Sequence, residues 1–313
     1  MKFKKSQLYL IIIILFILSL APHAKSIDYW AIDIFSHFPV QYAFFALSVL
    51  AVCIWKKNIP FAIFAGLLFA FNISVLGDAG ATVQAAGPAY KTFTVYSANI
   101  NKSNRDFPRL VAGLRETDAD ILLILEATEE NIRPLHPLIR EYPYSIVNLN
   151  IGSSGTGTAL MSKFPILKNE IEKYSEFGNM LVSATLQING KKVLFYGTHF
   201  PKPLTMKEFT ARSMQIISLA DKVNEQSVPV IVAGDFNATP YSPAFKKLLR
   251  KSGLKDSREG FGWQPTWPTQ FPLLWIPIDH ILVSPQIQVH KRATGSFIGS
   301  DHYPVFAELS ITN

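Results

Sequence analysis

The first 78 residues contain two long runs without a single charged side chain. Each run has 18 residues, Phe38–Trp55 and Ile59–Leu76, and only three residues separate them. A shorter apolar run, Leu8–Ala21, precedes them and follows three lysines. Uncharged runs of about 18 residues match a bilayer core roughly 30 Å thick. The sequence therefore predicts a membrane anchor of two or three transmembrane helices over residues 1–78.

The lysines around these runs predict how such an anchor would be oriented. Lysines gather at the N-terminus and again at Lys56 and Lys57, and positive charges favour the cytoplasmic side of a membrane. Everything after residue 80 would then lie outside the cytoplasm, which predicts an integral protein of a bacterial inner (cytoplasmic) membrane with the lipid bilayer as a partner. Two alternatives stay open: the first run is a cleaved signal peptide, or all three runs are buried core helices.

The composition of the sequence changes after the apolar runs. Residues 79–90 are small and nearly uncharged and read as a linker. Residues 90–313 hold 24 basic and 20 acidic residues, and a net charge of +4 is too mild to predict nucleic-acid binding by itself. The single cysteine, Cys53, excludes an intrachain disulfide and makes a cysteine-based metal site or catalytic thiol improbable.

Residues 91–313 alternate between strand-like and helix-like segments. Apolar positions spaced by three and four residues predict helices over 107–117, 206–224 and 241–252. Runs of apolar and β-branched residues predict strands over 92–100, 119–126, 156–166, 179–188, 191–200, 228–235, 277–284 and 302–311. Because several strands are consecutive, we expect two packed mixed β-sheets with helices outside, rather than a parallel βαβ array.

Polar side chains recur where these predicted strands end. They are Asn99, Asn101, Glu126, His199, Asp235, Asn237, Asp279, Asp301 and His302. Taken singly, each reads as a turn or cap residue. Taken together, they would gather carboxylates, amides and imidazoles along one rim, where crowded carboxylates need a cation. Oxygen-rich ligands without cysteine suit Mg²⁺ or Mn²⁺ better than Zn²⁺.

The order of these residues, with "GDFN" at 234–237 and "SDHYPV" at 300–305, resembles the endonuclease/exonuclease/phosphatase (DNase I-like) superfamily. The likeness covers about residues 92–311, and the preceding apolar runs are similar to a membrane-anchored bacterial branch. It implies a four-layer α/β sandwich and a divalent-metal-dependent hydrolase using Mg²⁺, or Mn²⁺. The metal ligands it implies are Asn99, Glu126 and Asp301. The catalytic residues it implies are His199, Asp235, Asn237, Asp279 and His302.

The resemblance also implies how the catalytic residues divide the work. His199 would contact the scissile phosphate, and Asp235 with Asn237 would position the water and the phosphate oxygens. Asp279 would orient the imidazole of His302. Whether Asp235 or His302 is the general base stays open, as does the number of metal ions. Asn101 is neutral where some relatives have a second acidic group.

The implied function is a membrane-anchored phosphoesterase that hydrolyses phosphodiesters by metal-assisted attack of water. Its substrate would be a nucleic acid or a phospholipid headgroup, and no obligate protein partner is evident. The alternative is a non-catalytic, membrane-tethered module that binds phosphate or nucleic acid. A transporter is disfavoured, because the apolar runs hold no ionisable residue inside them.

Three further features invite a choice between function and packing. His280 neighbours Asp279 on a predicted strand, so it faces the other way and we expect it to bond or pack in the interior. Arg212, on a predicted helix, would contact phosphate or lie on a solvated face. The segment 261–277, with three tryptophans, would line the pocket, stack on a base, dip into lipid headgroups or cover the second sheet.

Overall fold

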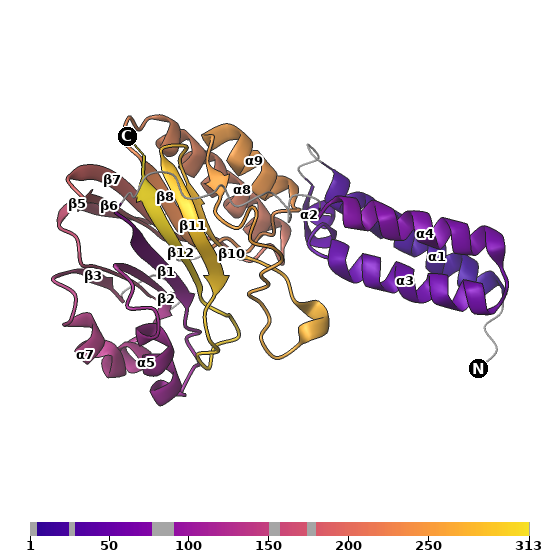
Figure 1. Ribbon diagram of the computed structural model, residues 1–313, viewed down its shortest axis with the longest axis horizontal. Helices are drawn as coiled ribbons and strands as arrows, with labels where there is room; N and C mark the ends of the chain where they lie inside the picture. Colours follow the sequence, from indigo (N-terminus) through magenta and orange to yellow (C-terminus); the bar gives the residue numbers. More distant parts are fainter. Residues whose placement is uncertain (1–4, 25–28, 77–90, 150–156, 174–179, 313) are drawn as a thin grey trace.

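A computed structural model of the chain describes residues 5–24, 29–76, 91–149, 157–173 and 180–312. Two six-stranded mixed sheets pack face to face at its centre (Figure 1). The first sheet has the order β11-β12-β1-β2-β4-β3 and the second has the order β5-β6-β7-β8-β10-β9. The expected pair of packed mixed sheets is confirmed.

The strand bounds show which residues each sheet contains. The first sheet consists of β1 (Phe93–Asn99), β2 (Ile121–Ala127), β3 (Tyr144–Asn148), β4 (Gly157–Ser162), β11 (Ile287–Thr294) and β12 (Val305–Ile311). The second consists of β5 (Ile166–Lys173), β6 (Met180–Ile188), β7 (Lys191–His199), β8 (Val230–Asp235), β9 (Lys255–Asp256) and β10 (Asp279–Val283). The pairs β1–β2 and β7–β8 are parallel, and the other strand pairs are antiparallel.

Helices cover the outer face of each sheet, which gives four layers (Figure 1). On the first sheet lie α5 (Phe107–Arg115), α6 (Glu129–Ile132), η3 (Arg133–Leu135) and α7 (His136–Ile139). On the second lie α8 (Met206–Asn224) and α9 (Pro243–Ser252). Apolar side chains from both sheets fill the space between them, and two further clusters join each sheet to its helices. This burial is the main favourable contribution to the stability of the fold.

The N-terminal segment forms a separate group of helices at one end of the sandwich (Figure 1). It consists of α1 (Lys5–Leu20), η1 (Ala21–His23), α2 (Trp30–Phe35), α3 (Pro39–Trp55) and α4 (Ile59–Ser74). The long helices α1, α3 and α4 pack on one another through two small apolar clusters. They are not core helices of the sandwich, because many of their side chains, such as Phe44, Trp55 and Leu67, are exposed.

The structure corrects the expected membrane anchor. The helices formed by the apolar runs have 16, 17 and 16 residues. At a rise of 1.5 Å per residue, 17 residues span about 26 Å, which is less than a hydrocarbon core of roughly 30 Å. Among the described residues, no helix is both long and apolar enough to cross a bilayer. The prediction of an integral membrane location is therefore wrong, and the expected transmembrane helices and bilayer partner find no support. The expected linker, 79–90, lies outside the described residues.

Candidate active site

The polar strand ends meet at one edge of the sandwich. Parallel pairing aligns the end of β7 with the end of β8, so that His199 lies opposite Asp235. Strand β10 runs antiparallel to β8 and begins at Asp279, which is also opposite Asp235. Asn99 ends β1 and lies beside the neighbouring strand β2, which carries Glu126. The fold thus brings side chains from both sheets to the same place.

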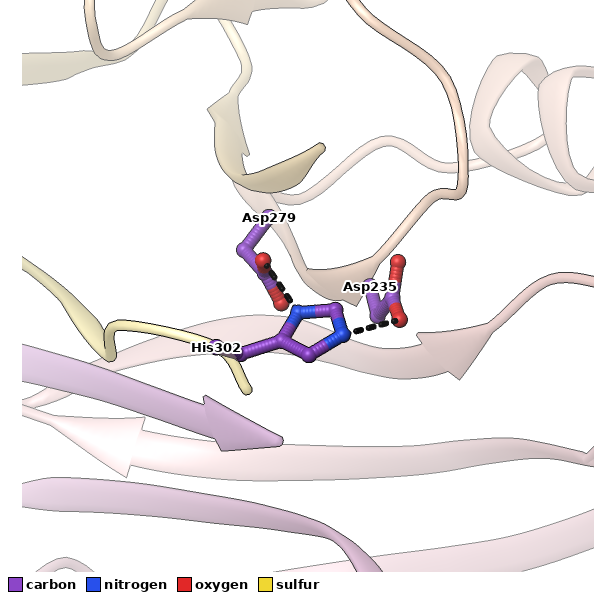
Figure 2. A group of neighbouring side chains, drawn as sticks. All are labelled: Asp235, Asp279 and His302. Atoms are coloured by element: carbon purple, nitrogen blue, oxygen red, sulfur yellow. Dashed lines mark hydrogen bonds and ion pairs between the residues drawn. The ribbon is translucent and has the colours of Figure 1, made fainter. Parts of the chain in front are cut away.

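Asp279, His302 and Asp235 form a line of three buried side chains (Figure 2). His302 Nδ1 lies 2.9 Å from Asp279 Oδ2, and His302 Nε2 lies 3.8 Å from Asp235 Oδ2. Burial by itself would lower the pKa of His302, but the charges of Asp279 and Asp235 outweigh it and raise the pKa to about 9. Burial and the charge of Asp279 raise the pKa of Asp235. The line therefore favours an imidazolium between two carboxylates.

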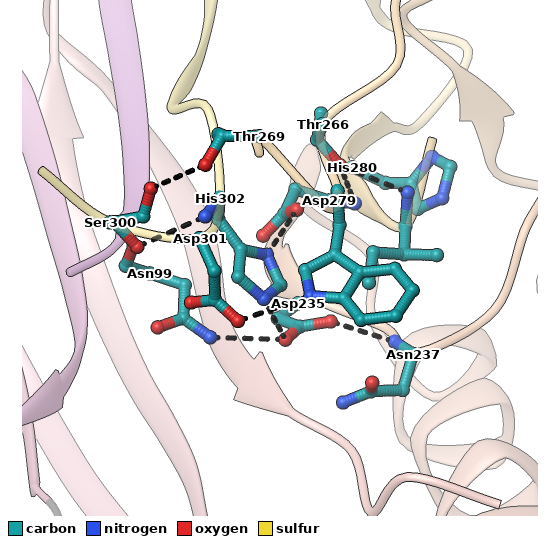
Figure 3. A network of polar contacts seen from close by, with 12 residues as sticks. Asn99, Asp235, Asn237, Thr266, Thr269, Asp279, His280, Ser300, Asp301 and His302 are labelled. Atoms are coloured by element: carbon teal, nitrogen blue, oxygen red, sulfur yellow. Dashed lines mark hydrogen bonds and ion pairs between the residues drawn. The ribbon is translucent and has the colours of Figure 1, made fainter. Parts of the chain in front are cut away.

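Asn99 joins the two sheets at the floor of the site (Figure 3). Its side-chain nitrogen donates to Asp235 Oδ2 at 3.1 Å and to Glu126 Oε1 at 3.0 Å. His199 lies between the same two carboxylates, with its Nε2 at 3.5 Å from Asp235 Oδ2 and 3.9 Å from Glu126 Oε1. One amide and one imidazole thus hold Asp235 and Glu126 together.

Glu126 is held as an anion in a strained backbone position. Its φ is +57°, a region that side-chain-bearing residues rarely adopt and that persists mainly at functional sites. Burial would raise the pKa of its carboxyl, but the charge of His199, the Asn99 hydrogen bond and the Lys102 amide outweigh burial and lower it. In the described part of the chain, His199 is its only ion-pair partner. The remaining lone pairs of the carboxylate suit a cation.

Asp301 is held by two side-chain donors. Asn101 Nδ2 donates to its Oδ1 at 2.7 Å, and Trp267 Nε1 donates to its Oδ2 at 3.1 Å. The backbone N–H of Asn101 also donates to Asn99 Oδ1 at 3.1 Å, so Asn101 links Asp301 to Asn99 at the floor of the site. Sequence reasoning did not identify Trp267 as a contact of Asp301, although one of its alternatives placed the tryptophan-rich segment at the pocket.

Residues 96–302, about two thirds of the chain, match the model of the Endonuclease/Exonuclease/phosphatase family. The chain belongs to this family. The match begins in β1 and ends at His302, so it covers the site and all of the sandwich except the start of β1 and the strand β12. No curated protein matches the chain significantly. The comparisons give no support to the narrower expectation of a membrane-anchored bacterial branch.

Several solved structures share the fold of this chain. One from Bacteroides vulgatus is 19% identical, with a TM-score of 0.61 over 71% of this chain and 99% of its own. Truncated TDP2 from Caenorhabditis elegans is 20% identical, with a TM-score of 0.57 over 70% and 97%. A mannosyl-6-phosphatase from Bacteroides thetaiotaomicron is 20% identical, with a TM-score of 0.57 over 70% and 100%. At these identities the likeness establishes the fold alone.

Asn237 stands close to Asp235, but its side chain has another partner. The Asn237 amide N–H donates to Asp235 Oδ1 at 2.8 Å, while its Nδ2 donates to the carbonyl oxygen of Phe200 at 2.8 Å. Its φ of +45° is again a strained value for a residue with a side chain. The segment "GDFN" therefore presents the backbone N–H of Asn237 to Asp235, and the side-chain Oδ1 of Asn237 remains for other contacts.

Two residues that the sequence left ambiguous lie in the interior. His280 is buried, with its Nε2 2.9 Å from the carbonyl oxygen of Ala238, which confirms the expected interior position. Arg212 is fully buried and donates from Nη1 to the carbonyl oxygen of Asn237 at 2.6 Å. Both expectations for Arg212, a phosphate contact and a solvated face, are therefore wrong.

Divalent cations serve many phosphoester hydrolases of this kind, and the site offers two sets of ligand atoms. In the described ranges, one group of acidic and histidine side chains brings its ligand atoms within 4.8 Å of one another: Asp235, Asp279 and His302. This is not the expected set. Because His302 Nδ1 is already bonded to Asp279, this group is better suited to proton transfer than to coordination. Glu126, with Asn99 beside it and Asp301 reached through Asn101, offers the oxygen donors that Mg²⁺ and Mn²⁺ prefer.

Proposed function

We propose that the chain is a divalent-metal-dependent phosphoesterase that hydrolyses a phosphoester by direct attack of water. The observation that supports it most is the line Asp279–His302–Asp235 beside the Asn99–Glu126 pair. A proton acceptor (Asp235), a cationic ring (His302) and an anionic metal ligand (Glu126) then surround the place where the phosphate would bind. Phosphoester hydrolysis needs these three groups together.

In this proposal Asp235 takes the proton of the attacking water. The water oxygen forms a bond to phosphorus, the ester P–O bond breaks, and the departing oxygen takes a proton from solvent. Asp235 is held for this task by the Asn237 amide and the Asn99 side chain, which leave it little rotational freedom. A carboxylate fixed in this way loses little entropy when it orients the water.

His302 acts as a cation rather than as the base. Its Nδ1 is bonded to Asp279, and its buried Nε2 has no hydrogen-bond partner among the described residues. A ring between two carboxylates is stabilised when protonated, and a protonated ring donates. Its Nε2, which lies 3.8 Å from Asp235 Oδ2, would then donate to a phosphate oxygen bound beside Asp235, where negative charge develops. His199, beside Asp235 and Glu126, adds a second contact to the phosphate.

Glu126 is the principal metal ligand in this proposal, with Asn99 and Asp301 completing the set for Mg²⁺ or Mn²⁺. A cation bound there would supply positive charge beside the phosphate and the departing oxygen. Asn101, which is neutral, acts by holding Asp301 through its Nδ2 donor. Trp267 does the same from the opposite oxygen of that carboxylate.

The substrate class is a phosphoester, and two family members of known structure differ in what they act on. TDP2 from Danio rerio has been solved with a single-strand DNA product, at 17% identity and a TM-score of 0.59. The Bacteroides thetaiotaomicron protein is a mannosyl-6-phosphatase. The candidates are therefore a nucleic acid, a sugar phosphate and a phospholipid headgroup, and all share the reacting phosphate. A non-catalytic phosphate-binding module is disfavoured, because the line of three side chains is intact.

The test uses the full chain with Mg²⁺, Mn²⁺ or EDTA. The substrates are single-strand DNA, mannose 6-phosphate, micellar phospholipid and bis-p-nitrophenyl phosphate. We expect metal-dependent release of product that His302→Ala lowers by about 10²–10⁴-fold. His136→Ala is the matched control, since His136 lies exposed on α7, outside the site. Equal activity in both variants, or none in the native chain with any substrate, would overturn the proposal.

A further inference from the structure

The N-terminal helices contact three loops that carry site residues. The Trp30 indole N–H donates to the carbonyl oxygen of Pro203 at 2.8 Å, four residues after His199. The Gln41 side chain donates to the carbonyl oxygen of Trp275 at 2.9 Å, four residues before Asp279. Asp33 and His37 lie between Trp30 and Gln41 in the sequence. They reach the loop that follows Asp235 through Arg212 and Thr239. The short segment 30–41 therefore touches the approach to His199, Asp235 and Asp279 at once.

The central contact is a buried charge pair. Asp33, on α2, bonds through Oδ2 to Arg212 Nη2 of α8, and both side chains are fully buried. The other arm of the guanidinium, Nη1, donates to the carbonyl oxygen of Asn237 at 2.6 Å. A buried cation needs a compensating anion, and Asp33 is the acidic residue that bonds to it. Arg212 can hold the Asn237 backbone only because the N-terminal segment neutralises it.

A second contact from the same segment holds the next turn of the loop. Both the backbone N–H and the hydroxyl group of Thr239 lie close to His37 Nδ1, at 3.3 Å and 3.0 Å. With Nδ1 accepting, the ring proton is on Nε2, which lies 3.6 Å from Asp33 Oδ2. Asp33 therefore supports the first contact with the loop by its bond to Arg212, and it lies beside the His37 ring that makes the second.

The loop needs such support because its backbone is strained. Asn237 has a φ of +45°, and its amide N–H must still meet Asp235 Oδ1 at 2.8 Å. A strained residue keeps its conformation only when the surrounding structure holds it there. Arg212 holds the carbonyl group of this same residue, across one Cα atom from the backbone N–H that orients Asp235, so it restrains the strained conformation of Asn237.

We infer that Asp33 and His37 are positioning residues for the catalytic loop 235–239, so that the N-terminal helices are part of the active enzyme. The inference rests on the proposed function for its kinetic consequence. Their effect reaches Asp235 through Arg212, Asn237 and Thr239, without contact to the substrate. Loss of either residue should misplace Asp235, which slows the chemical step more than it weakens substrate binding.

The test compares Asp33→Asn with the native full chain. Asparagine keeps the size of the side chain and one acceptor oxygen but removes the charge that compensates Arg212. We expect kcat to fall about 10- to 100-fold, with KM changing less than about threefold. Hydrogen exchange of the backbone amides in peptide 235–240, followed by mass spectrometry, should accelerate at least about tenfold.

Lys246→Met is the matched control. Lys246 Nζ donates to the carbonyl oxygen of Pro22 at 2.7 Å, so it also joins the N-terminal helices to the sandwich, but from α9 and away from the loop. We expect both kcat and loop exchange to stay within about twofold of the native chain. A loss in this variant equal to that in Asp33→Asn would mean that both residues act only on general stability, and would overturn the inference.

His37→Phe is a second variant in case Asp33→Asn does not fold. It keeps an aromatic ring but removes the acceptor of Thr239, so amide exchange at Thr239 should rise about tenfold. Unchanged exchange and unchanged kcat in either variant would overturn the inference. If the native chain hydrolyses no phosphoester, the proposed function fails, and the exchange of the loop amides still decides whether the helices hold the loop.

Discussion

Gly234 lies in β8, immediately before Asp235, and its replacement by alanine tests how tightly the site is tied to the sheet. Its φ is +143°, which L side chains rarely adopt. A Cβ atom built there would lie 1.8 Å from the carbonyl oxygen of Thr198, where an ordinary contact begins at 3.4 Å. Gly234→Ala therefore requires the backbones of β7 and β8 to separate by more than an ångström.

The cost follows from the position of β8 between two strands. Gly234 pairs with Thr198 on one side and with His280 on the other, so β8 cannot move away from β7 without breaking its hydrogen bonds to β7 and pressing against β10. The strained φ alone costs about 1–3 kcal/mol for a residue with a side chain. With the displaced pairing added, we expect the free energy of unfolding to fall by about 3–5 kcal/mol.

The assay is urea unfolding followed by tryptophan fluorescence, together with phosphoester hydrolysis. Gly190→Ala is the matched control, because Gly190 also has a positive φ, +83°, but nothing lies within 4 Å of its added Cβ. It should cost about 1–2 kcal/mol and leave activity unchanged. If Gly234→Ala destabilised the protein no more than Gly190→Ala does, the close approach of β7 and β8 would not constrain the site as reasoned above.

Two further predictions concern the buried carboxylate of Asp256 and the indole donor of Trp267. Burial by itself would raise the pKa of Asp256, but His280 and Arg258 lower it from 3.8 to about 2. Because the folded pKa is depressed, this carboxylate stabilises the fold by about 2 kcal/mol above pH 4, and the contribution is lost as the pH falls towards 2. Unfolding midpoints between pH 5 and pH 2.5 should therefore fall less steeply in Asp256→Asn, and an unchanged slope would contradict this. Trp267→Phe removes the indole donor to Asp301 and should weaken Mg²⁺ binding about tenfold by calorimetry, whereas Trp263→Phe, at an exposed position of the same segment, should not.

The sequence predicted the interior of the sandwich better than its edges. The expected helix over 206–224 coincides with α8, and the strands at the centre of each sheet were all expected. The strands that the sequence did not indicate, β3, β5, β9 and β11, are the four edge strands. An edge strand is exposed along one side, so its sequence carries charges, as in β5 with "ILKNEIEK", and lacks the apolar run of a central strand.

The sequence predicted which polar side chains gather at one rim, whereas their catalytic and metal-binding roles stay predictions and the residues that support them were not predicted. The strand-end residues were expected at one rim, and the structure brings Asn99, Glu126, His199, Asp235, Asp279 and His302 together there. Trp267 and Asp33 were not predicted, because each acts across a long stretch of chain, 34 residues from Asp301 and 179 from Arg212. No local pattern signals such a contact.

The N-terminal runs show what hydropathy alone does not predict, which is the length of the helices. Their uncharged length of 18 residues suggested membrane spans, but α3 begins one residue inside its run and α4 ends two residues before the end of its run, so these helices have at most 17 residues. The sequence reports how apolar a segment is, whereas the helix ends depend on the turns that the chain makes.

The amino-acid sequence by itself determined the class of fold and the gathering of polar residues at one rim, because both follow from local patterns: period-two and period-3.6 hydrophobicity, and polar residues at strand ends. Only the tertiary structure decided that the imidazole of His302 lies between two carboxylates, that Gly234 has no room for a side chain, and that Asp33 balances the charge of Arg212. These depend on distances between segments far apart in the chain. Charge compensation and close packing are set by those distances, and they arise only when the two sheets and the N-terminal helices come together.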